Sequence, residues 1–557
     1  MKMRHIVRVL FAAVASLVIL APIAMNAQGV TESMLLNPPP DSWPTHHGDY
    51  SARRFSKLKV INNTNVQYLS LDWESRVTGG TPANAPPGRG GAGNVRVAGS
   101  PLLVNGMLYF TANDNAWAMD IRTGRITWHW YRESTGPEPV TANKGMGMYG
   151  NWLYFITRDN YLVSLDATTG AQRWIQPVAD PKQYYFSTMA PIVIKNHVIV
   201  GTGGDSLDLS GFVQARDPET GEIQWTHYNT PREGEPGIET WPSEYAAAHG
   251  GGGAWVQGAY DPELNLYYYG TANPNPVYAP QSRKGADLYT SSIIAVNPDT
   301  GKMAWYFQAS PHDTHDWDAA CDMVLIDGTI HGKPRKLLAH ASRNGFFFVL
   351  DRTNGKEIVS VPYVDTENWT KSLDARGEPI PDPAKEPSLG GSLAWPNAGS
   401  ATNWPPPSFS PQTGLFYVGT GEGYAVFYLT DTDEHPEGYA GIESALGEGP
   451  GSIKALDYRT GKVVWRHDWP NGGSAVGLLS TAGDLLFCGN ANNLVAFNAH
   501  TGKILWHAGL LAAPNAPMTF MLDGQQHVLV FAGDTAYNFV LNAPAPTAAA
   551  KAPAKKK

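Results

Sequence analysis

Four acidic residues and two histidines lie within the stretch SPHDTHDWDAACD, residues 310–322, in a chain that is only 16% charged. If the first ten of these residues are extended, side chains alternate, and one face then carries His312, Thr314, Asp316 and Asp318. Two carboxylates on one face repel each other unless a cation or a proton lies between them. The stretch therefore predicts either a cation site led by the two aspartates or an acidic loop that caps backbone N–H groups.

The two histidines of this stretch do not favour a zinc site. In an extended segment His312 and His315 would face opposite sides and could not bind one ion together. The face opposite to Asp316 carries Asp313 and His315, and we expect these two side chains to hold the loop in place.

A recurring phrase indicates the elements that position this stretch. It reads AMDIRTGRITW, SLDATTGAQRW, ARDPETGEIQW, AVNPDTGKMAW, ALDYRTGKVVW and AFNAHTGKILW, and these copies end at Trp128, Trp174, Trp225, Trp305, Trp465 and Trp506. A degenerate copy, VLDRTNGKEIV, surrounds Gly355. In each copy an Asp or Asn can accept backbone N–H bonds at a turn, and the Gly supplies a positive-φ position. Each copy is therefore interpreted as a β-hairpin whose Trp packs against a neighbour.

Further strand pairs are predicted at 260–271 and 409–420, and the spacing of the turns is uneven, with the longest interval between Asp351 and Asp457. Such intervals fit four-stranded blades separated by insertions, and radial repetition protects the sheet edges. We predict an all-β fold, an eight-bladed β-propeller of four-stranded antiparallel blades. A tandem β-sandwich does not explain the fixed position of the Trp, and 58 Gly and 43 Pro with little helical periodicity disfavour an α/β fold.

The ends of the chain differ from this repeated region. Basic residues precede a short apolar run that contains Pro22, so residues 1–27 are predicted to be a signal peptide rather than a membrane anchor. We expect a single propeller domain over 28–545, a disordered basic tail over 546–557, and no membrane span after signal removal. The formal net charge of −9 gives no reason to expect a nucleic-acid partner.

Only two cysteines are present, Cys321 and Cys488. They could pair in an oxidising compartment or remain isolated buried thiols. Neither belongs to a CxxCH motif, so no covalent c-type haem is expected.

Four stretches carry a specific family resemblance: WPTHHGDYSARRFS from Trp43, PHDTHDWD at 311–318, SRNGFFFVLDRTNG at 342–355 and ATNWPPPSFSPQTGLFYVG at 401–419. Together they resemble the quinoprotein alcohol and methanol dehydrogenases, secreted eight-bladed propellers with tryptophan-docking repeats that use pyrroloquinoline quinone (PQQ). The resemblance extends from Trp43 to near Asn542. It implies a periplasmic enzyme that oxidises an alcohol to an aldehyde by hydride transfer to a quinone bound to Ca²⁺ or a lanthanide ion. A soluble cytochrome c-type protein would be the electron acceptor.

The resemblance also implies roles for individual residues. Asp316 matches the catalytic carboxylate that takes the alcohol proton, and Arg343 matches the arginine that bonds the quinone oxygens. Asn273 matches a metal ligand, Asp318 matches an additional acidic ligand of the lanthanide-using branch, and Trp255 matches the indole beneath the cofactor. Further cofactor contacts are expected from Asn403, Trp404, Thr188 and Lys144. Without the resemblance, a turn Asn, a surface Arg and a core Trp would be ordinary interpretations of Asn273, Arg343 and Trp255.

The chain departs from the family at two places. Ser206 stands where many members have a metal-binding Glu; we keep it as a candidate ligand, with Asp205 or Asp208 as possible substitutes. Glu138 and Pro139 replace an adjacent Cys-Cys pair. Two other functions stay open at this point, a non-catalytic periplasmic β-propeller scaffold and a quinoprotein that oxidises sugars or polyols.

Overall fold

The structure of the chain is a computed structural model, which describes residues 29–78, 95–134, 143–203, 208–399, 401–447, 449–470 and 476–542. The predicted signal peptide and basic tail lie outside the described residues, as do Glu138, Pro139, Asp205 and Ser206. Within the described ranges, no helix is long and apolar enough to cross a membrane.

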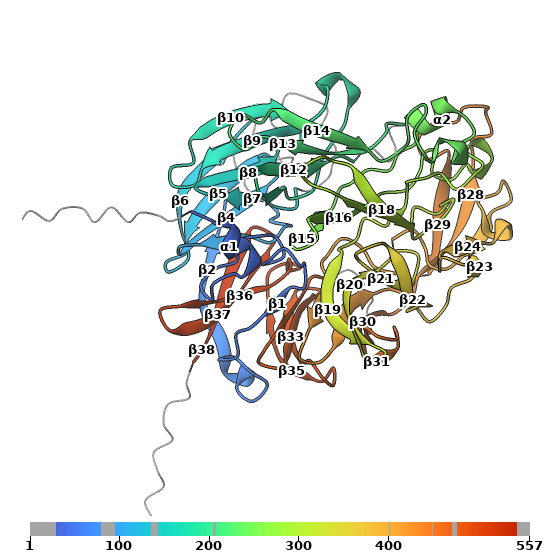
Figure 1. Cartoon of the computed structure of the whole chain (residues 1–557). Helices are drawn as coiled ribbons and strands as arrows, with labels where there is room; N and C mark the ends of the chain where they lie inside the picture. The colour runs from blue at the N-terminus through green and yellow to red at the C-terminus, as the bar shows by residue number, and fades with distance from the viewer. Residues whose placement is uncertain are drawn as a thin grey trace, which may run out of the picture.

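Eight sheets of four or five strands form the fold, which confirms the predicted class (Figure 1). Five of these blades follow one another along the chain, each a simple antiparallel meander. Their strands are β3 (Leu102–Val104), β4 (Met107–Ala112), β5 (Asn115–Asp120), β6 (Arg125–Tyr131); β7 (Gly147–Tyr149), β8 (Trp152–Ile156), β9 (Tyr161–Asp166), β10 (Gln172–Pro177); β11 (Ile192–Ile194), β12 (His197–Gly201), β13 (Phe212–Arg216), β14 (Ile223–Tyr228); β15 (Ala259–Asp261), β16 (Leu266–Gly270), β17 (Ser292–Val296), β18 (Met303–Gln308); and β19 (Val324–Ile330), β20 (Lys333–Ala341), β21 (Phe346–Asp351), β22 (Lys356–Pro362).

The remaining three blades include strands that are distant in the sequence. The sixth blade consists of β26 (Ser408–Ser410), β27 (Leu415–Thr420), β30 (Gly451–Asp457) and β31 (Val463–Trp469). The seventh consists of β32 (Leu478–Thr481), β33 (Leu485–Asn490), β34 (Asn493–Asn498) and β35 (Ile504–Gly509), with β1 (Phe55–Ser56) parallel to β32. The eighth pairs β2 (Leu69–Arg76) with β36 (Met518–Leu522), β37 (Gln525–Ala532) and β38 (Thr535–Leu541).

The repeated phrase forms the third and fourth strands of its blade, as predicted, and its Trp docks on the next blade. The indole Nε1 of Trp128 donates to the carbonyl of Ala167 at 2.9 Å, and that of Trp225 donates to the carbonyl of Pro298 at 2.7 Å. Trp174, Trp305 and Trp465 make the same kind of bond with the following blade. Each Trp therefore satisfies its buried N–H while its ring covers the turn glycine of its neighbour.

Three further contacts complete the ring. The indole of Trp506 donates to the carbonyl of Leu69 on β2, and the ring of Trp73 on β2 lies against the turn at Gly124 of the first blade. In the degenerate copy Val359 stands at the position of the Trp, and Val361, two residues later, lies against Gly461 of the sixth blade. The sequence of docking contacts thus passes once around all eight blades.

Replacing Gly301 by Ala should destabilise the protein by about 1–3 kcal/mol more than replacing Gly524 by Ala. Both glycines have positive φ, but a Cβ at Gly301 would lie 2.6 Å from the ring of Trp225, whereas nothing lies within 4 Å of a Cβ at Gly524. Urea unfolding of the two variants measures the difference. Equal losses in both would mean that the Trp–Gly contact does not contribute to docking.

An axial segment, residues 29–56, contacts the first strand of each blade or the residue after it. Its backbone or side chains bond with Leu103, Gly150, Val193, Tyr260, Leu325, Phe409, Ser480 and Met521. First strands of neighbouring blades also contact one another, so they line the centre of the ring. The motif WPTHHGDYSARRFS is therefore explained as a segment that joins the blades at their centre.

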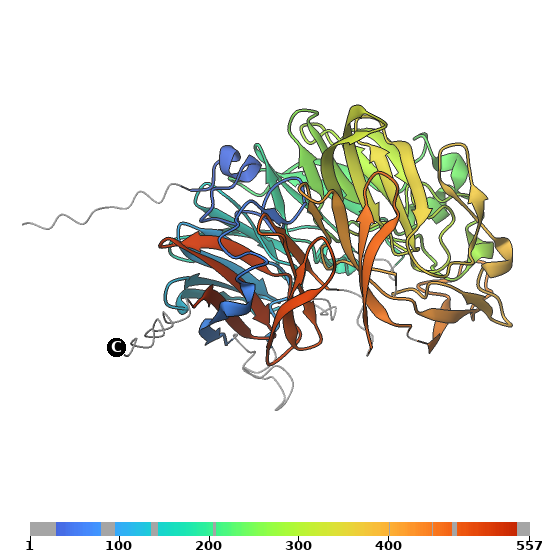
Figure 2. The ribbon, with the colours of Figure 1, turned by 90° about the horizontal axis from the view of Figure 1, so that it is seen from below.

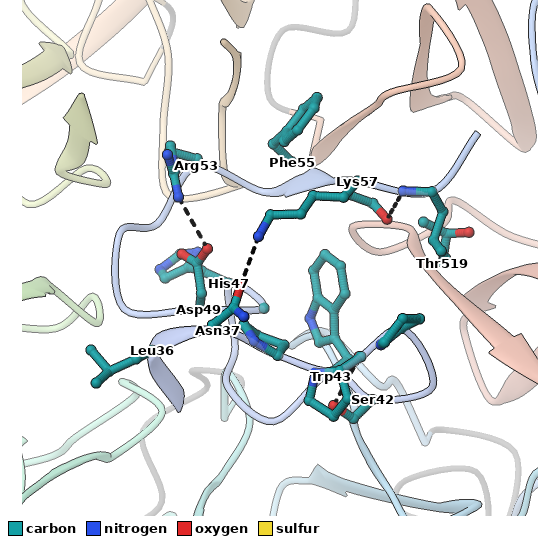
Figure 3. Close-up of a pocket in the computed structure, with 16 residues that line it drawn as sticks. Leu36, Asn37, Ser42, Trp43, His47, Asp49, Arg53, Phe55, Lys57 and Thr519 are labelled. Atoms are coloured by element: carbon teal, nitrogen blue, oxygen red, sulfur yellow. Dashed lines mark hydrogen bonds and ion pairs between the residues drawn. The ribbon is translucent and has the colours of Figure 1, made fainter. Parts of the chain in front are cut away.

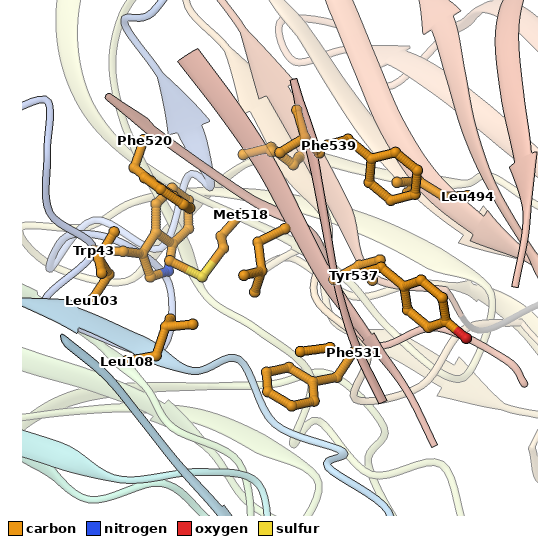
Figure 4. Close-up of a cluster of buried hydrophobic side chains, with 14 of the residues drawn as sticks. Trp43, Leu103, Leu108, Leu494, Met518, Phe520, Phe531, Tyr537 and Phe539 are labelled. Atoms are coloured by element: carbon orange, nitrogen blue, oxygen red, sulfur yellow. The ribbon is translucent and has the colours of Figure 1, made fainter. Parts of the chain in front are cut away.

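The largest apolar cluster lies where the two ends of the described chain meet (Figure 4). Trp43 of the axial segment packs there with Leu103 of the first blade and with Met518 and Phe520 of the eighth. All four side chains are buried, so the hydrophobic effect stabilises ring closure at this point.

Three insertions extend the ring on one side, where Figures 1 and 2 both place the green α2 region and the yellow-orange region of β23, β24, β28 and β29. The first follows β14 and contains α2 (Glu244–Ala248). The second, between β22 and β26, contains β23 (Thr370–Leu373), β24 (Pro379–Pro381) and β25 (Ser392–Ala394). The third, between β27 and β30, contains β28 (Tyr424–Leu429) and β29 (Gly441–Gly447). These segments account for the long turn intervals. The other short helices are α1 (Glu32–Leu36) and the 3₁₀ helices η1 (Val66–Tyr68), η2 (Pro181–Gln183), η3 (Ile238–Thr240), η4 (Pro280–Ser282) and η5 (Pro383–Lys385).

Candidate active site

The predicted site residues converge because of where they stand relative to the first strands. Lys144, Trp255, Asp318 and Trp404 each lie a few residues before the first strand of a different blade, β7, β15, β19 and β26. Since these strands all line the axis, the segments that lead into them meet at one end of it. This arrangement brings together residues that are up to 260 positions apart in the sequence.

The loop at 310–322 is not an extended strand, so the prediction of one shared face for His312, Thr314, Asp316 and Asp318 is wrong. His312 and Asp316 have φ angles of 48° and 65°, and these left-handed residues break the alternation. Nδ1 of His312 lies 3.2 Å from Oδ2 of Asp287, away from Asp316, and the hydroxyl of Thr314 contacts the ring of His315. Only Asp316 and Asp318 come together, and they do so at Arg343.

The expected anchoring role of Asp313 and His315 agrees with their contacts. Asp313 accepts the backbone N–H groups of His315 and Trp317 at 2.9 and 2.7 Å. The ring of His315 stacks on Trp317 with centroids 4.2 Å apart, and burial lowers the pKa of His315 to about 3. Arg283, which is fully buried, donates to the carbonyl of Asp313. Sequence reasoning missed Arg283, because no motif marks it.

Arg343 is the centre of the acidic group. Its Nη1 lies 2.9 Å from Oδ2 of Asp318 and 3.5 Å from Oδ1 of Asp316, and its Nε and Nη2 donate to the carbonyl of Ala398. Burial by itself would lower the pKa of Arg343, but the charges of Asp316 and Asp318 outweigh burial and raise it. The side chain therefore stays cationic and fixes the two carboxylates close to each other.

Asp318 is held by three donors from three segments. Its Oδ2 accepts from Nε1 of Trp255 at 2.9 Å as well as from Arg343, and its Oδ1 accepts the backbone N–H of Asn273 at 2.7 Å. The side-chain Oδ1 of Asn273 is buried and has no hydrogen-bond partner, and the residue is 1% exposed. A buried amide oxygen without a donor is costly unless a cation or water binds it. The residues present therefore fit an ion that prefers oxygen ligands, with Asn273, Asp316 and Asp318 as its holders.

The predicted cofactor contacts surround the indole of Trp255. Nζ of Lys144 lies 4.5 Å from the centroid of this ring and 5.3 Å from that of Trp404. Lys144 also donates to the hydroxyl of Thr188, which in turn donates to the carbonyl of Trp255 at 3.0 Å. Asn403 accepts the backbone N–H of Trp404 at 2.8 Å. A flat anionic molecule would find here an aromatic face, a buried amine and several polar groups.

Two further predictions concern Asp208 and the two cysteines. Both carboxylate oxygens of Asp208 accept the backbone N–H of Gly438, in a cavity of about 380 Å³ that also contains His249 and His435. The described contacts do not join Asp208 to Asp316, Asp318 or Asn273, and its role as a metal ligand stays a prediction. Cys321 and Cys488 are both free and buried, which decides the open question of their pairing.

The fold and this site together define a quinoprotein-type β-propeller, and comparisons with known proteins agree. The family described as "Glucose/ethanol/alcohol dehydrogenase, beta-propeller domain" matches residues 43–371, and the family "Outer membrane protein assembly factor BamB" matches residues 449–540. The chain belongs to the family of PQQ-dependent (quinoprotein) alcohol dehydrogenases.

Relatives of the chain are similar over most of their length. It is 35% identical to the quinohemoprotein alcohol dehydrogenase ADH IIB of Pseudomonas putida, over 92% of this chain and 76% of that protein. It is 32% identical to the lanthanide-dependent methanol dehydrogenase of Methylacidiphilum fumariolicum, over 91% of this chain and 87% of that protein. The crystal structure of the quinohemoprotein alcohol dehydrogenase from Comamonas testosteroni superposes with a TM-score of 0.81 at 32% identity, over 93% of this chain and 83% of that one. The predicted family is confirmed.

Proposed function

We propose that the chain oxidises an alcohol to an aldehyde with PQQ and a Ca²⁺ or lanthanide ion bound at this site. The main support for the proposal is that Asp316 and Asp318 both contact Arg343. The amide oxygen of Asn273, whose backbone N–H binds Asp318, has no hydrogen-bond partner. Such a set of oxygen atoms suits a hard cation and not zinc.

PQQ would be held over Trp255, with Lys144, Thr188, Asn403 and Trp404 at its edges and Arg343 near the metal ligands. When bound, the quinone accepts the hydride from the alcohol carbon, and the ion withdraws electron density from it. The protein would orient the alcohol, exclude water and hold the proton acceptor.

Asp316 is proposed as the proton acceptor for the alcohol hydroxyl. Its side chain is 19% exposed, whereas that of Asp318 is 1% exposed and already accepts three N–H groups. The partly open carboxylate is therefore the one that a substrate can reach. Asp318 would lie between Arg343 and the cation and hold both in place.

The metal is proposed to be a lanthanide or Ca²⁺, because both prefer carboxylate and amide oxygens. Asp318 adds a negative charge that favours a trivalent ion. Asp205 and Ser206 remain predictions for a further ligand.

The electron acceptor is proposed to be a separate soluble cytochrome c-type protein, and the working compartment to be the periplasm. Neither cysteine belongs to a CxxCH motif, so this sequence offers no covalent haem of its own.

Reconstitution tests the function. The purified chain is mixed with PQQ and either Ca²⁺ or La³⁺, and reduction of an artificial dye is followed with primary alcohols, sugars and polyols as separate substrates. We expect alcohol-dependent reduction that needs both PQQ and one of the ions. Activity with sugars or polyols alone would reassign the substrate, and absence of both PQQ binding and activity would favour the scaffold alternative.

A further inference from the structure

A second group of titratable side chains lies at the axis and has no part in the function proposed above. His46 and His47 belong to the axial segment, Asp322 ends the site loop, and His340 lies on β20. Their exposed fractions are 4%, 2%, 2% and 0%. We call these four residues the axial polar cluster.

The axial polar cluster contains many buried polar atoms without partners. Nδ1 of His46, both ring nitrogens of His47 and of His340, and both carboxylate oxygens of Asp322 have no hydrogen-bond partner. Nε2 of His47 lies 3.3 Å from Oδ1 of Asp322, but the pair is not oriented as a hydrogen bond. Leaving so many buried donors and acceptors unsatisfied would be very costly. Ordered water between these side chains would remove this cost.

The cluster shares neighbours with the candidate active site on two sides. Cys321 lies in the loop between Asp318 and Asp322. Burial raises the pKa of its thiol; the charge of Arg343 lowers this pKa, and the charges of Asp322 and Asp318 raise it further. On the other side, burial and then the charges of His47, Arg54 and Lys144 hold the pKa of His46 well below its usual value. A Cβ at Gly145, the residue after Lys144, would lie 3.6 Å from Nδ1 of His46, so this end of the site lies beside the cluster.

The cluster also reaches a cavity that is separate from the substrate side. His47 lines a pocket of about 130 Å³ together with Trp43, Asp49, Arg53 and Lys57, shown in Figure 3. Arg53 and Asp49 form an ion pair of 3.5 Å at its edge, and their side chains are 32% and 19% exposed. The inner wall of a solvent-facing pocket is thus a histidine whose other neighbours are Asp322 and His46.

We propose that the axial polar cluster is a proton outlet from the active site to the pocket at Asp49 and Arg53. The inference rests on the proposed function. Oxidation of a primary alcohol removes a hydride from carbon and a proton from oxygen, and two one-electron acceptors then take the electron pair. Two protons per alcohol are left at the site and must reach solvent. In this outlet, water in the cluster receives a proton from the site and passes it to Asp322 or His47. His47 then releases the proton into the pocket, and both side chains return to their starting protonation states.

Asp322→Asn and His47→Gln test the outlet in the reconstituted holoenzyme. Proton release is followed with a pH-indicator dye in weak buffer, at the same time as electron acceptor reduction. We expect release to be at least tenfold slower in both variants, with the isotope effect of a deuterated alcohol reduced because the hydride step is no longer limiting. Small diffusible buffers such as imidazole should restore the rate.

His227→Gln is the matched control, because Nε2 of His227 is also buried without a partner but lies on β14, in the outermost strand of another blade. This variant should release protons at the normal rate. Release at the normal rate in folded Asp322→Asn and His47→Gln, or equal slowing in His227→Gln, would overturn the outlet.

A measurement without cofactor separates this inference from the proposed function. Deuterium exchange at the imidazole C2 carbon, read by mass spectrometry on the full chain, reports contact with solvent. We expect His47 to exchange several-fold faster than His227, although His47 is the more buried of the two side chains. Equal or slower exchange at His47 would overturn the outlet. Failure of reconstitution with fast exchange at His47 would count against the proposed function alone.

Discussion

Replacing Asp316 by Asn should lower kcat by about a hundredfold to ten-thousandfold while leaving the fold intact. The amide keeps the size of the carboxylate but cannot accept the alcohol proton. Arg343 retains its 2.9 Å contact with Asp318 and its bonds to Ala398, so we expect the free energy of unfolding to change by less than about 2 kcal/mol. Steady-state dye reduction and urea unfolding measure the two quantities.

Glu386→Gln is the control for this variant. Its carboxylate lies 3.8 Å from Nε2 of His312, at the same loop, but no described contact joins it to Arg343. Turnover should stay within a factor of two or three of the unchanged chain. An Asp316→Asn protein with nearly full kcat would remove Asp316 from the role of proton acceptor.

Replacing Asp318 by Asn should destabilise the protein by about 3–5 kcal/mol and weaken metal binding. Asp318 accepts N–H groups from Trp255, Asn273 and Arg343, and an Asn would point its own NH₂ group at one of these donors. It would also leave the buried Arg343 with only the 3.5 Å contact to Asp316. Urea unfolding gives the stability, and luminescence titration with Tb³⁺ gives the affinity for a lanthanide.

Asp299→Asn provides a comparison at the surface. Asp299 pairs with Lys195 at 3.0 Å, but its side chain is 41% exposed, so its loss should cost less than about 1 kcal/mol. If Asp318→Asn were as mild as this variant, Asp318 would not be the link that joins the three segments. Unchanged Tb³⁺ affinity would separately exclude it as a metal ligand.

Most of the fold could be predicted from the sequence because each repeat is a motif of residues close together in the chain. An Asp or Asn, a Gly and a Trp at fixed spacing predict a hairpin and its docking contact, and both are present at Trp128, Trp225 and Trp465. The contacts at Trp73 and Val361 were not predicted, since β2 lacks the turn motif and the fifth blade lacks the Trp. Their identity depends on which blades are neighbours in space.

The sequence named residues that the structure brings together at Arg343, but it did not predict the geometry of their loop. The resemblance identified Asp316, Asp318, Arg343 and Asn273. In the structure both Arg343 and the backbone N–H of Asn273 donate to the carboxylate of Asp318. The alternation argument failed because two residues of the loop adopt left-handed backbone conformations, which residue types alone did not indicate.

The sequence also did not predict that Arg283 supports the loop at 310–322. This side chain reaches Asp313 from thirty positions earlier, and its other bonds go to Asp287 and to the backbone carbonyls of Pro276 and Val277. Such long-range bonds to backbone atoms leave no pattern of residue types.

β2 pairs with β38, so the eighth blade can form only after β38 has been made. The axial segment and β2 are made long before their partners Met521 and Phe539. Until then β2 is an unpaired edge, and unpaired edges favour wrong association. The segments that carry Lys144, Trp255, Asp318 and Trp404 acquire their final positions only when the ring closes. We therefore expect the cofactor and the ion to be loaded into a completed chain and not into a growing one.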